Sequence, residues 1–377
     1  MHLSIVYQSI QNEPFLRKDY VYMSKPQVIA FYLPQFYPTK ENDEWWQKGF
    51  TEWTNVGKAK PLFKGHYQPR VPADLGYYDL RLPEVREQQA ELAHEAGIDG
   101  FCYWHYWFAG RRLLDRVFTE VVESGKPDFP FCLCWANHSW YQKTWDPSKP
   151  DKLLIEQTYP GEEDYVNHFK AMLPAFKDSR YIKTDGKLNF GIFGADKIPS
   201  FPLMKEIWND LATKNGLPEF FFWGLAQGRK RLLDVKNMDY DGIIYDNLQT
   251  VYDQSFSFAR RAYDKIFNRP HVIDYQEYVK MSVSFFEEHK DLFPCIMPNF
   301  DHSPRSMTRG VILHRDTPQK WEKFFQEVYH MQSQKNNSMI IIKSWNEWGE
   351  GNYLEPDLKF GKQYLEAIKK VINPSNF

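Results

Sequence analysis

Eight short apolar runs alternate with longer amphipathic segments along most of this chain. The runs are rich in β-branched and aromatic residues and show no regular alternation of polar and apolar positions. Continuous apolar runs of this kind are typical of strands that are buried on both faces, as in a parallel sheet. The predicted strands are 28–33, 99–104, 129–135, 188–193, 220–226, 242–246, 294–300 and 339–345.

Apolar residues at helical spacing mark the segments between these strands. Strands that alternate with helices predict an α/β protein built as a single (β/α)8 TIM barrel. A doubly wound open sheet is the alternative, but no glycine fingerprint follows the first strand. The predicted helices are 83–97, 113–125, 163–177, 204–216, 275–289, 318–331 and 361–372.

The connection between the first strand and its helix, 34–82, is unusually long. Long connections inside compact domains are usually functional. Three tryptophans in it, Trp45, Trp46 and Trp53, form either a sugar platform or a packing surface against the barrel rim. Packing is favoured for Trp45 and Trp46, whereas Trp53 suits both roles equally.

The amino-acid composition excludes some classes of function, whereas it says little about the fold. Phe, Tyr and Trp make up 17% of the residues, whereas the formal net charge is only −2. A near-zero charge argues against a partner such as nucleic acid or an anionic membrane surface, because binding to these needs a basic excess. Surplus aromatic rings instead suit a protein that stacks them on the apolar faces of sugars, so we expect an oligo- or polysaccharide partner.

The ends of the chain and its cysteines carry weaker signals. The first residues lack the basic and apolar regions of a signal peptide, and no stretch approaches the apolar length of a membrane span. We therefore expect a cytoplasmic protein. Residues 1–25 are expected to form an N-terminal extension, and 26–377 one catalytic domain. The four cysteines lie in apolar runs and are predicted to be buried, reduced thiols.

Metal and phosphate sites have only weak support. His105, His138 and His302 could ligate a metal together with Asp301, but none of them has ligand spacing, so we expect no metal and no cofactor. Asp239-Tyr240-Asp241 matches the D-x-D motif of sugar-nucleotide transferases but precedes a predicted strand. Gly228-Arg229-Lys230-Arg231 could bind phosphate, although a solvated charge cluster is the default interpretation.

Polar and aromatic side chains follow most of the predicted strands. In a barrel of this kind the active site lies at the carboxyl ends of the strands, so these side chains are expected to line one mouth. The candidates for substrate binding by this argument are Gln35, Trp104, His105, Tyr106, Trp135, Asn137, His138, Trp140, Tyr245, Asp301, Arg305, Asn346 and Trp348.

Glu347 and Glu350, directly after the eighth predicted strand, are the sharpest candidates for catalysis. Residues three apart in a turn or short helix lie roughly 5–6 Å from each other. Carboxylates about 5–5.5 Å apart suit retaining glycoside hydrolysis, and about 6.5–9.5 Å suits inversion. Neighbouring carboxylates also separate each other's pKa values, so that one serves as acid and the other as base. The competing interpretation is two ordinary surface acids on a solvated loop.

Several motifs occur in a fixed order along the chain. They are FYLPQFYP (31–38), EWTNV (52–56), HYQPRVP (66–72), GFCYWHYWF (100–108), WANHSW (135–140), a D-x-x-x-R after the seventh strand, and WNEWGEG-x-x-LEP (345–356). With these motifs the chain resembles, over residues 26–372, the WbsX-like proteins, which are related to glycoside hydrolase family 99. The resemblance implies a (β/α)8 barrel that acts on a glycan.

The resemblance also implies a chemistry. Family 99 enzymes cleave internal α-mannosidic bonds with retention, through a 1,2-anhydro intermediate formed by the sugar 2-hydroxyl. Glu347 matches the base that acts on this hydroxyl, and Glu350 matches the acid and base at the leaving group. Gly349 stands where family 99 itself has a histidine. The residues implied to hold the sugar are Tyr32, His105, Asn137, His138, Asp301 and Arg305.

The sequence therefore favours a retaining glycoside hydrolase that acts on α-linked sugars, either manno-configured or 6-deoxy. A glycosyltransferase of O-antigen or capsular polysaccharide synthesis is the first alternative, because WbsX-like proteins often carry that label. A non-catalytic glycan-binding barrel is the second alternative, and it requires one glutamate of the pair to be misplaced or dispensable.

Overall fold

The structure is a computed structural model that describes residues 24–142, 150–255, 257, 262–264 and 266–374. The extension expected at residues 1–25 lies almost wholly outside these described residues. No helix in the described part of the chain is long and apolar enough to cross a membrane.

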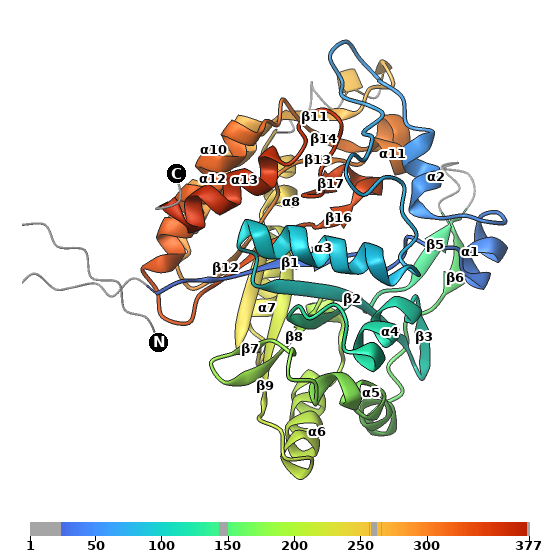
Figure 1. Ribbon diagram of the computed structural model, residues 1–377, viewed down its shortest axis with the longest axis vertical. Helices are drawn as coiled ribbons and strands as arrows, with labels where there is room; N and C mark the ends of the chain where they lie inside the picture. The colour runs from blue at the N-terminus through green and yellow to red at the C-terminus, as the bar shows by residue number, and fades with distance from the viewer. Residues whose placement is uncertain (1–23, 143–149, 256, 258–261, 265, 375–377) are drawn as a thin grey trace, which may run out of the picture.

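A closed barrel of eight parallel strands forms the centre of the molecule (Figure 1). Each strand pairs with the next barrel strand along the chain, and the first pairs with both the second and the last, which closes the sheet. All eight predicted strands and the predicted barrel are confirmed. The barrel strands are β1 (Gln27–Tyr32), β2 (Gly100–Phe108), β4 (Phe131–Trp135), β8 (Lys187–Ile192), β9 (Phe220–Gln227), β10 (Gly242–Asp246), β12 (Phe293–Ile296) and β15 (Met339–Ile342).

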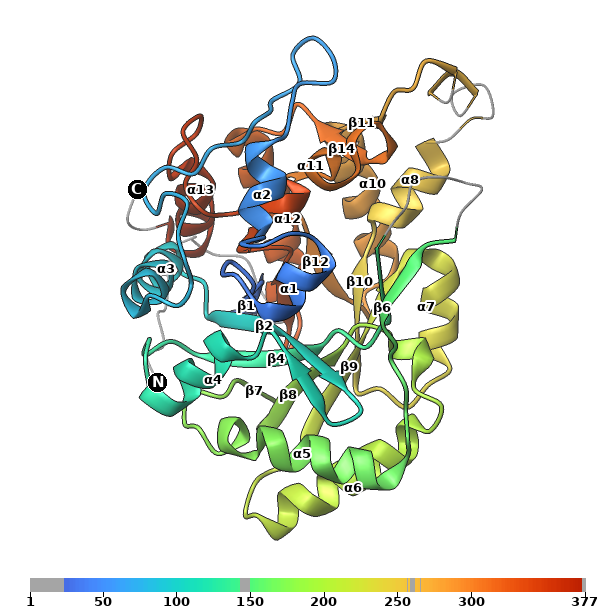
Figure 2. The same ribbon diagram turned by 90° about the vertical axis from the view of Figure 1, so that its right-hand side faces the viewer.

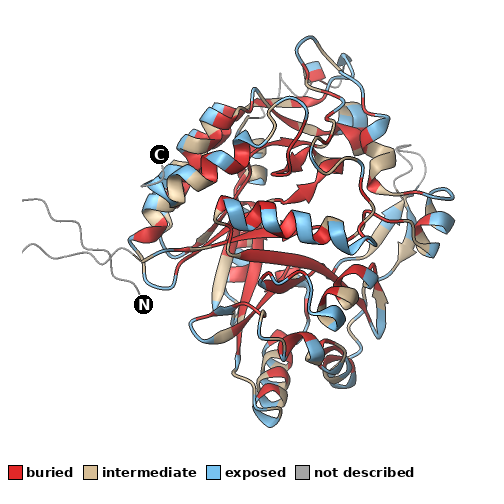
Figure 3. Ribbon diagram, in the orientation of Figure 1, coloured by how far each residue is buried: buried red, intermediate tan, exposed pale blue. Residues whose placement is uncertain are grey.

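Helices cover the outside of this barrel and bury one face each against the strands, as the alternation of red and blue in Figure 3 shows. The seven predicted helices are present, with ends shifted by at most a few residues. An eighth, α7, begins at the charged run that the sequence did not assign to a helix, and it buries Leu232 and Val235. These helices are α3 (Pro83–Ala96), α4 (Arg116–Ser124), α5 (Glu162–Phe176), α6 (Phe201–Lys214), α7 (Gly228–Lys236), α10 (Tyr275–Glu288), α12 (Pro318–Ser333) and α13 (Gln363–Ile372).

Aromatic side chains fill much of the barrel and its helix interface. Inside the barrel, Phe31 stacks on Trp104 with ring centroids 4.3 Å apart, and Trp223 packs beside Phe31. Gly191 makes room for Trp223, because a Cβ at this glycine would lie 2.2 Å from the indole ring. The aromatic excess in the composition is therefore largely core.

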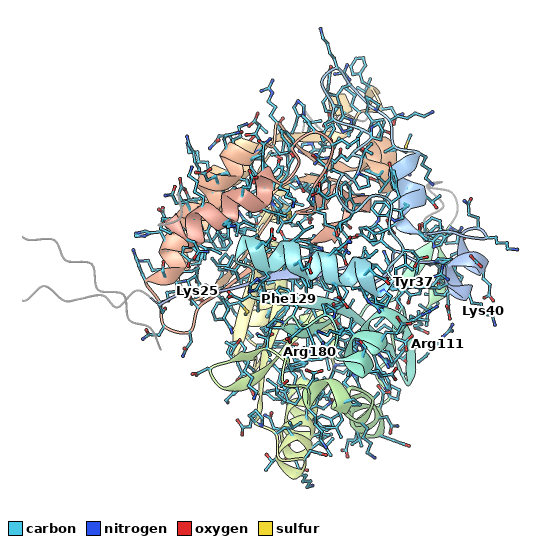
Figure 4. The ribbon with its side chains drawn as sticks, viewed as in Figure 1. Lys25, Tyr37, Lys40, Arg111, Phe129 and Arg180 are labelled. Carbon is cyan, nitrogen blue, oxygen red and sulfur yellow. The ribbon has the colours of Figure 1, made fainter. Side chains whose placement is uncertain are left out.

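The long first connection lies across the mouth of the barrel (Figure 2). It contains α1 (Lys40–Trp45) and α2 (Glu52–Gly57), and it faces the hairpin of β5 (Trp140–Gln142) and β6 (Lys152–Ile155). An ion pair from Arg111, the first residue of β3 (Arg111–Leu113), to Glu41, at 3.0 Å, links α1 to the hairpin of β2 and β3, at the corner where Figure 4 labels Lys40 and Arg111.

Short elements complete the loops around the barrel. They are β3 (Arg111–Leu113), β7 (Lys183–Thr184), η1 (Ala195–Lys197), α8 (Leu248–Ser255), β11 (His271–Asp274), β13 (Phe300–Asp301), α11 (Ser303–Ser306), η2 (Met307–Arg309), β14 (Val311–His314), β16 (Asn346–Glu347), η3 (Trp348–Glu350) and β17 (Asn352–Tyr353).

Candidate active site

A cavity of about 900 Å³ opens at the carboxyl ends of the barrel strands, below the long first connection. This is the end at which barrels of this class carry their active sites. Eight of the residues expected from the sequence line it: Gln35, Trp104, Tyr106, His138, Trp140, Arg305, Glu347 and Glu350.

The turn that carries both glutamates is held to the barrel by hydrogen bonds and ring contacts of its neighbouring residues. The side chain of Asn346 accepts a hydrogen bond from the Leu33 amide (2.7 Å) and donates one to the Leu33 carbonyl (3.1 Å). Trp348 is buried, stacks on Tyr353 at 3.7 Å, and donates from its indole nitrogen to Glu355 at 2.6 Å. Both glutamates therefore project from a turn that is held in place by Asn346 and by the buried side chain of Trp348.

Arg305, from the short helix α11, joins the two glutamates. Its Nη2 donates to Glu347 Oε1 at 2.6 Å, and its Nη1 donates to Glu350 Oε1 at 2.7 Å. A single guanidinium group therefore holds both carboxyl groups, which we call the carboxyl pair. Charge-assisted bonds of this length are the strong ones, and the planar guanidinium also fixes geometry.

The two members of the carboxyl pair have opposite proton affinities. Burial raises the pKa of Glu347 to about 7, because the attraction of Arg305 is offset by repulsion from Glu350 and a third carboxylate, Glu52. Burial also acts on Glu350, but Lys343, Arg305 and His302 outweigh it and lower the pKa of Glu350 to about 2. Near neutral pH Glu350 is therefore ionised while Glu347 is only partly ionised, so the pair can both give and take a proton.

Lys343, at the end of β15, provides the second positive charge near Glu350. Its Nζ lies 3.9 Å from Glu350 Oε2 and 3.6 Å from Asp246 Oδ2. Burial alone would lower the pKa of Lys343, but Asp246 and Glu350 reverse this and raise it. The lysine is therefore charged throughout the physiological pH range, and it makes Glu350 the ionised member of the pair.

Aromatic side chains line the same cavity as the carboxyl pair, and we call them the aromatic wall: Trp45, Trp46, Trp104, Tyr106, Trp140 and Phe193. Trp140 makes edge contacts with Tyr106 at 5.1 Å and with Trp45 at 5.8 Å, and Trp104 contacts Phe193 at 5.7 Å. Trp46, which also lines the cavity, is 45% exposed. Trp45 and Trp46, for which the sequence favoured packing, thus contribute ring surface to the cavity.

The remaining nine residues expected at the mouth do not line this cavity. They are Tyr32, Trp53, His105, Trp135, Asn137, Tyr245, Asp301, Asn346 and Trp348. Their side chains pack within the barrel or hydrogen-bond to the loops around the cavity, as the contacts of Asn346 and Trp348 above show.

Three of these residues, Tyr32, His105 and Tyr245, point out of the barrel toward the helices. The hydroxyl of Tyr32 donates to Gln89 Oε1 on α3 at 2.6 Å. The ring nitrogens of His105 and His168 on α5 lie 2.8 Å apart, and burial lowers the pKa of His105 to about 3. Tyr245 also faces a helix. Strand residues alternate in direction, so one step along β2 separates His105 from the cavity residues Trp104 and Tyr106.

Three others organise loops beside the cavity. Trp135 donates from its indole nitrogen to the Trp107 carbonyl at 3.1 Å. The amide group of Asn137 donates to the Gly194 carbonyl at 3.0 Å and accepts from the Gly194 amide at 2.6 Å. Trp53 donates to the Tyr78 carbonyl at 2.7 Å, so of its two predicted roles the structure shows packing.

Asp301 is fully buried and anchors the long first connection. Its Oδ2 lies 2.7 Å from the ring of His66 and accepts a hydrogen bond from the Gln68 amide at 2.7 Å. These bonds tie the connection between β1 and α3 to the connection that carries Arg305. Asp301 therefore acts behind Arg305 and does not reach into the cavity.

Sequence reasoning missed several polar residues of the cavity, among them Glu52, Lys343 and Gln227. Glu52 belongs to the EWTNV motif, yet its long connection could not be placed over the mouth from sequence alone. Lys343 lies within the eighth predicted strand, where position after the strand gave no signal. His302, considered above only as a metal ligand, also lines the cavity, 3.8 Å from Glu350.

No group of three His, Cys, Asp or Glu side chains in the described part of the chain is placed to hold a metal ion. The D-x-D carboxylates, Asp239 and Asp241, both pair with Lys205. They lie at the amino end of β10, away from the cavity. The four cysteines are buried and free, as predicted.

A second cavity of about 820 Å³ adjoins the first. Gln227, His302, Lys343 and Glu350 line both cavities. Its other walls are charged, and they include Lys197, Lys230, Arg231, Asp196, Asp234 and Asp253. The hydrogen bond from Arg231 to Asp196, 2.9 Å long, shows that part of this charge is compensated within the cavity.

A sequence model of a family described as "Glycosyltransferase WbsX" matches residues 28–368. The chain belongs to the WbsX family. Two proteins from Xanthomonas campestris pv. campestris, each described as "Uncharacterized protein WxcX", are 33% identical to it over 350 residues. The match covers 92% of this chain but 49% of those proteins, so this WbsX-family chain spans about half the length of the curated relatives it matches.

Solved structures of two other proteins share the fold of this WbsX-family chain. A structure described as "Glycoside hydrolase-like protein" superposes with a TM-score of 0.55 at 15% identity, covering 96% of this chain and 97% of that one. The family 99 endo-α-mannosidase from Bacteroides thetaiotaomicron superposes with a TM-score of 0.53 at 14% identity, covering 93% and 97%. At this identity the likeness concerns the fold.

Proposed function

We propose that this protein is a retaining glycoside hydrolase that cleaves α-linked, manno-configured or 6-deoxy sugars in a polysaccharide. The observation that carries the proposal is the carboxyl pair at the barrel mouth. Glu347 and Glu350 share one guanidinium group, and their surroundings move their pKa values to opposite sides of the ordinary value of 4.5. The aromatic wall of the same cavity supplies flat apolar surface for sugar rings.

The chemistry needs one proton donor and one proton acceptor. The base takes the proton of the sugar 2-hydroxyl while O2 attacks C1, and the acid protonates the departing glycosidic oxygen. Water then attacks C1 of the 1,2-anhydro sugar, giving its proton to the former acid, while the former base returns its proton to O2. Two inversions at C1 leave the configuration unchanged, and both glutamates recover their starting states.

Two observations assign the roles in opposite order. The family resemblance implies that Glu347 is the base and Glu350 the acid. The charges of the free site leave the proton on Glu347 and ionise Glu350. The proposal therefore concerns the carboxyl pair as a unit. Which glutamate is the acid can be determined with an aryl glycoside that has a good leaving group. The variant that lacks the acid retains the larger share of its activity on that substrate, because the leaving oxygen no longer needs a proton.

A glycosyltransferase is the second candidate, and the description of the matching family model favours it. The second cavity brings Lys230 and Arg231 close to Lys343 and Glu350, where a sugar nucleotide would place its phosphates. Against this candidate, five carboxylates line the same cavity and repel phosphate: Asp196, Asp234, Asp246, Asp253 and Glu350.

The test is reducing-end release from a panel of α-mannans and rhamnose-containing polysaccharides. Wild type is compared with Glu347→Gln, Glu350→Gln and the exposed control Glu44→Gln. Release by wild type and control, with loss in both other variants, is the expected result. A protein that releases nucleotide from sugar nucleotides and leaves the polymers intact is a transferase, and one that binds glycans without either reaction is a binding barrel.

A further inference from the structure

A third carboxylate, Glu52, reaches the carboxyl pair from a segment far away in sequence. It is the first residue of α2 in the long first connection, and only 8% of it is exposed. Its Oε2 lies 3.1 Å from both Nε and Nη2 of Arg305. The helix α2 packs against both η3, which carries Glu350, and α11, which carries Arg305.

We propose that Glu52 is a positioning residue for the carboxyl pair, which it serves by fixing the guanidinium group of Arg305. The inference rests on the proposed function, since it names what holds the proposed catalytic groups in place. It goes beyond that function because it assigns a role to the long first connection, which otherwise only covers the mouth.

The geometry of the guanidinium group carries the argument. Its Nη1 is occupied by Glu350 and its Nη2 by Glu347. Glu52 takes the remaining edge, formed by Nε and Nη2, so that rotation of the group in its own plane is blocked. Without Glu52, Arg305 would be free to turn toward either member of the pair and to change their separation.

Glu52 is itself held by neighbours that leave little freedom. Gln35, just after β1, donates to its Oε1 at 3.2 Å, and Asn55, one turn further along α2, donates to its Oε2 at 3.4 Å. One oxygen is thus bonded from the connection that follows β1 and the other from within α2. A carboxylate fixed at both oxygens orients its arginine more strictly than a mobile one.

Gly349, between the two glutamates, provides the space that Glu52 occupies. A Cβ on Gly349 would lie 2.1 Å from Glu52 Oε2 and 2.9 Å from Arg305 Nε. The backbone of Gly349 is not in the left-handed region, so conformation does not require glycine here. Space is the reason for glycine: any side chain at 349 would push Glu52 away from the guanidinium group.

The charge of Glu52 has a further effect on the pair. Glu52 is the strongest of the carboxylates that act on Arg305, and it also raises the pKa of Glu347. Arg305 therefore divides its charge among three acids and leaves Glu347 able to keep a proton. A merely structural contact would hold the loop in place without altering this proton affinity.

The test combines kinetics with a direct titration. Wild type, Glu52→Gln, Glu52→Asp and the same-loop control Glu44→Gln are assayed on the glycan that wild type cleaves. The ¹³C carboxyl signals of labelled glutamate are followed against pH, with Glu347→Gln assigning the signal of Glu347. We expect Glu52→Gln to lower kcat by roughly 10²-fold, as a displacement of about 1 Å can, with KM within threefold. We also expect its Glu347 signal to titrate at lower pH.

Glu52→Asp keeps the charge, so we expect it to restore the Glu347 titration, and the control should match wild type in both measurements. An unchanged kcat or an unchanged Glu347 titration in Glu52→Gln overturns the inference. If wild type cleaves no glycan, the proposed function fails, and the titration still decides whether Glu52 acts on the pair.

Gly349→Ala gives an independent check, which still applies if Glu52→Gln does not fold. Alanine at 349 should reduce kcat strongly when Glu52 is present, because the two collide. In a Glu52→Ala background the same change should have a smaller further effect, since only the contact of the new Cβ with Arg305 Nε, at 2.9 Å, remains. Equal effects of Gly349→Ala in both backgrounds would show that the glycine serves another purpose.

Discussion

Glu347 is held in a state that costs the folded protein stability at neutral and alkaline pH. Its pKa is raised from the ordinary 4.5 to about 7, so the folded state binds this proton more tightly than the unfolded state does. The associated stability is complete below pH 4.5 and is lost as the pH rises through about 7. A pKa change of this size corresponds to about 3 kcal/mol.

Glu347→Gln removes the titration while it keeps the shape of the neutral side chain. Unfolding a chain of 377 residues carries an entropy of about 0.8 kcal/mol per kelvin, from about 2.1 cal/mol/K per residue. Between pH 5 and pH 8 wild type loses about 2.5 kcal/mol of this stability, so the variant should gain about 3 °C in Tm relative to wild type over that interval. Glu350→Gln should instead lower Tm at pH 6, because the pKa of Glu350 is depressed to about 2 and its charge is stabilising.

Differential scanning calorimetry at pH 5, 6 and 8 measures these differences, with the exposed Glu44→Gln as the matched control. The control should show the same difference from wild type at each pH. A Tm difference between Glu347→Gln and wild type that stays constant from pH 5 to pH 8 would refute the reasoning. Identical behaviour of Glu347→Gln and Glu350→Gln would refute it as well, because their surroundings act in opposite directions.

Three further changes have defined outcomes. Trp140→Ala should raise KM about tenfold and change kcat little, because it removes ring surface worth about 1.4 kcal/mol from the aromatic wall; steady-state kinetics on the cleaved glycan checks this. Lys343→Met should raise the pKa of Glu350 and move the acidic limb of the pH–rate profile to higher pH, whereas an unmoved limb would contradict its place beside that carboxylate. Asp301→Asn should cost about 1–3 kcal/mol in the free energy of unfolding by denaturant, because an amide group would face the donor of Gln68.

Much of the barrel could be predicted because each strand and helix carries its own local signal. The buried strands read as continuous apolar runs, and α3 has its proline and its terminal Gly97 at the expected places. The helix α7 was missed because its first turn, Gly228-Arg229-Lys230-Arg231, is charged and only Leu232 and Val235 face the barrel. Tertiary packing, not local pattern, makes this segment helical.

The sequence by itself determined the order of the elements, the closed barrel they predict and the position of Glu347 and Glu350 after the last strand. Only the tertiary structure decided which side chains face the cavity. Neighbours on one strand point to opposite sides, so Trp104 enters the cavity while His105 pairs with His168 outside the barrel.

The electrostatics of the pair also belong to the tertiary structure alone. The charges that move the pKa values of the two glutamates apart come from Glu52, Arg305 and Lys343. Glu52 and Arg305 are 253 residues apart in the sequence, yet they form an ion pair in the fold. Coulombic forces act through space and depend on distance and burial, so no local pattern in the sequence records them. The sequence gives the positions of the two glutamates, and the tertiary structure sets their pKa values and thereby which of them keeps its proton.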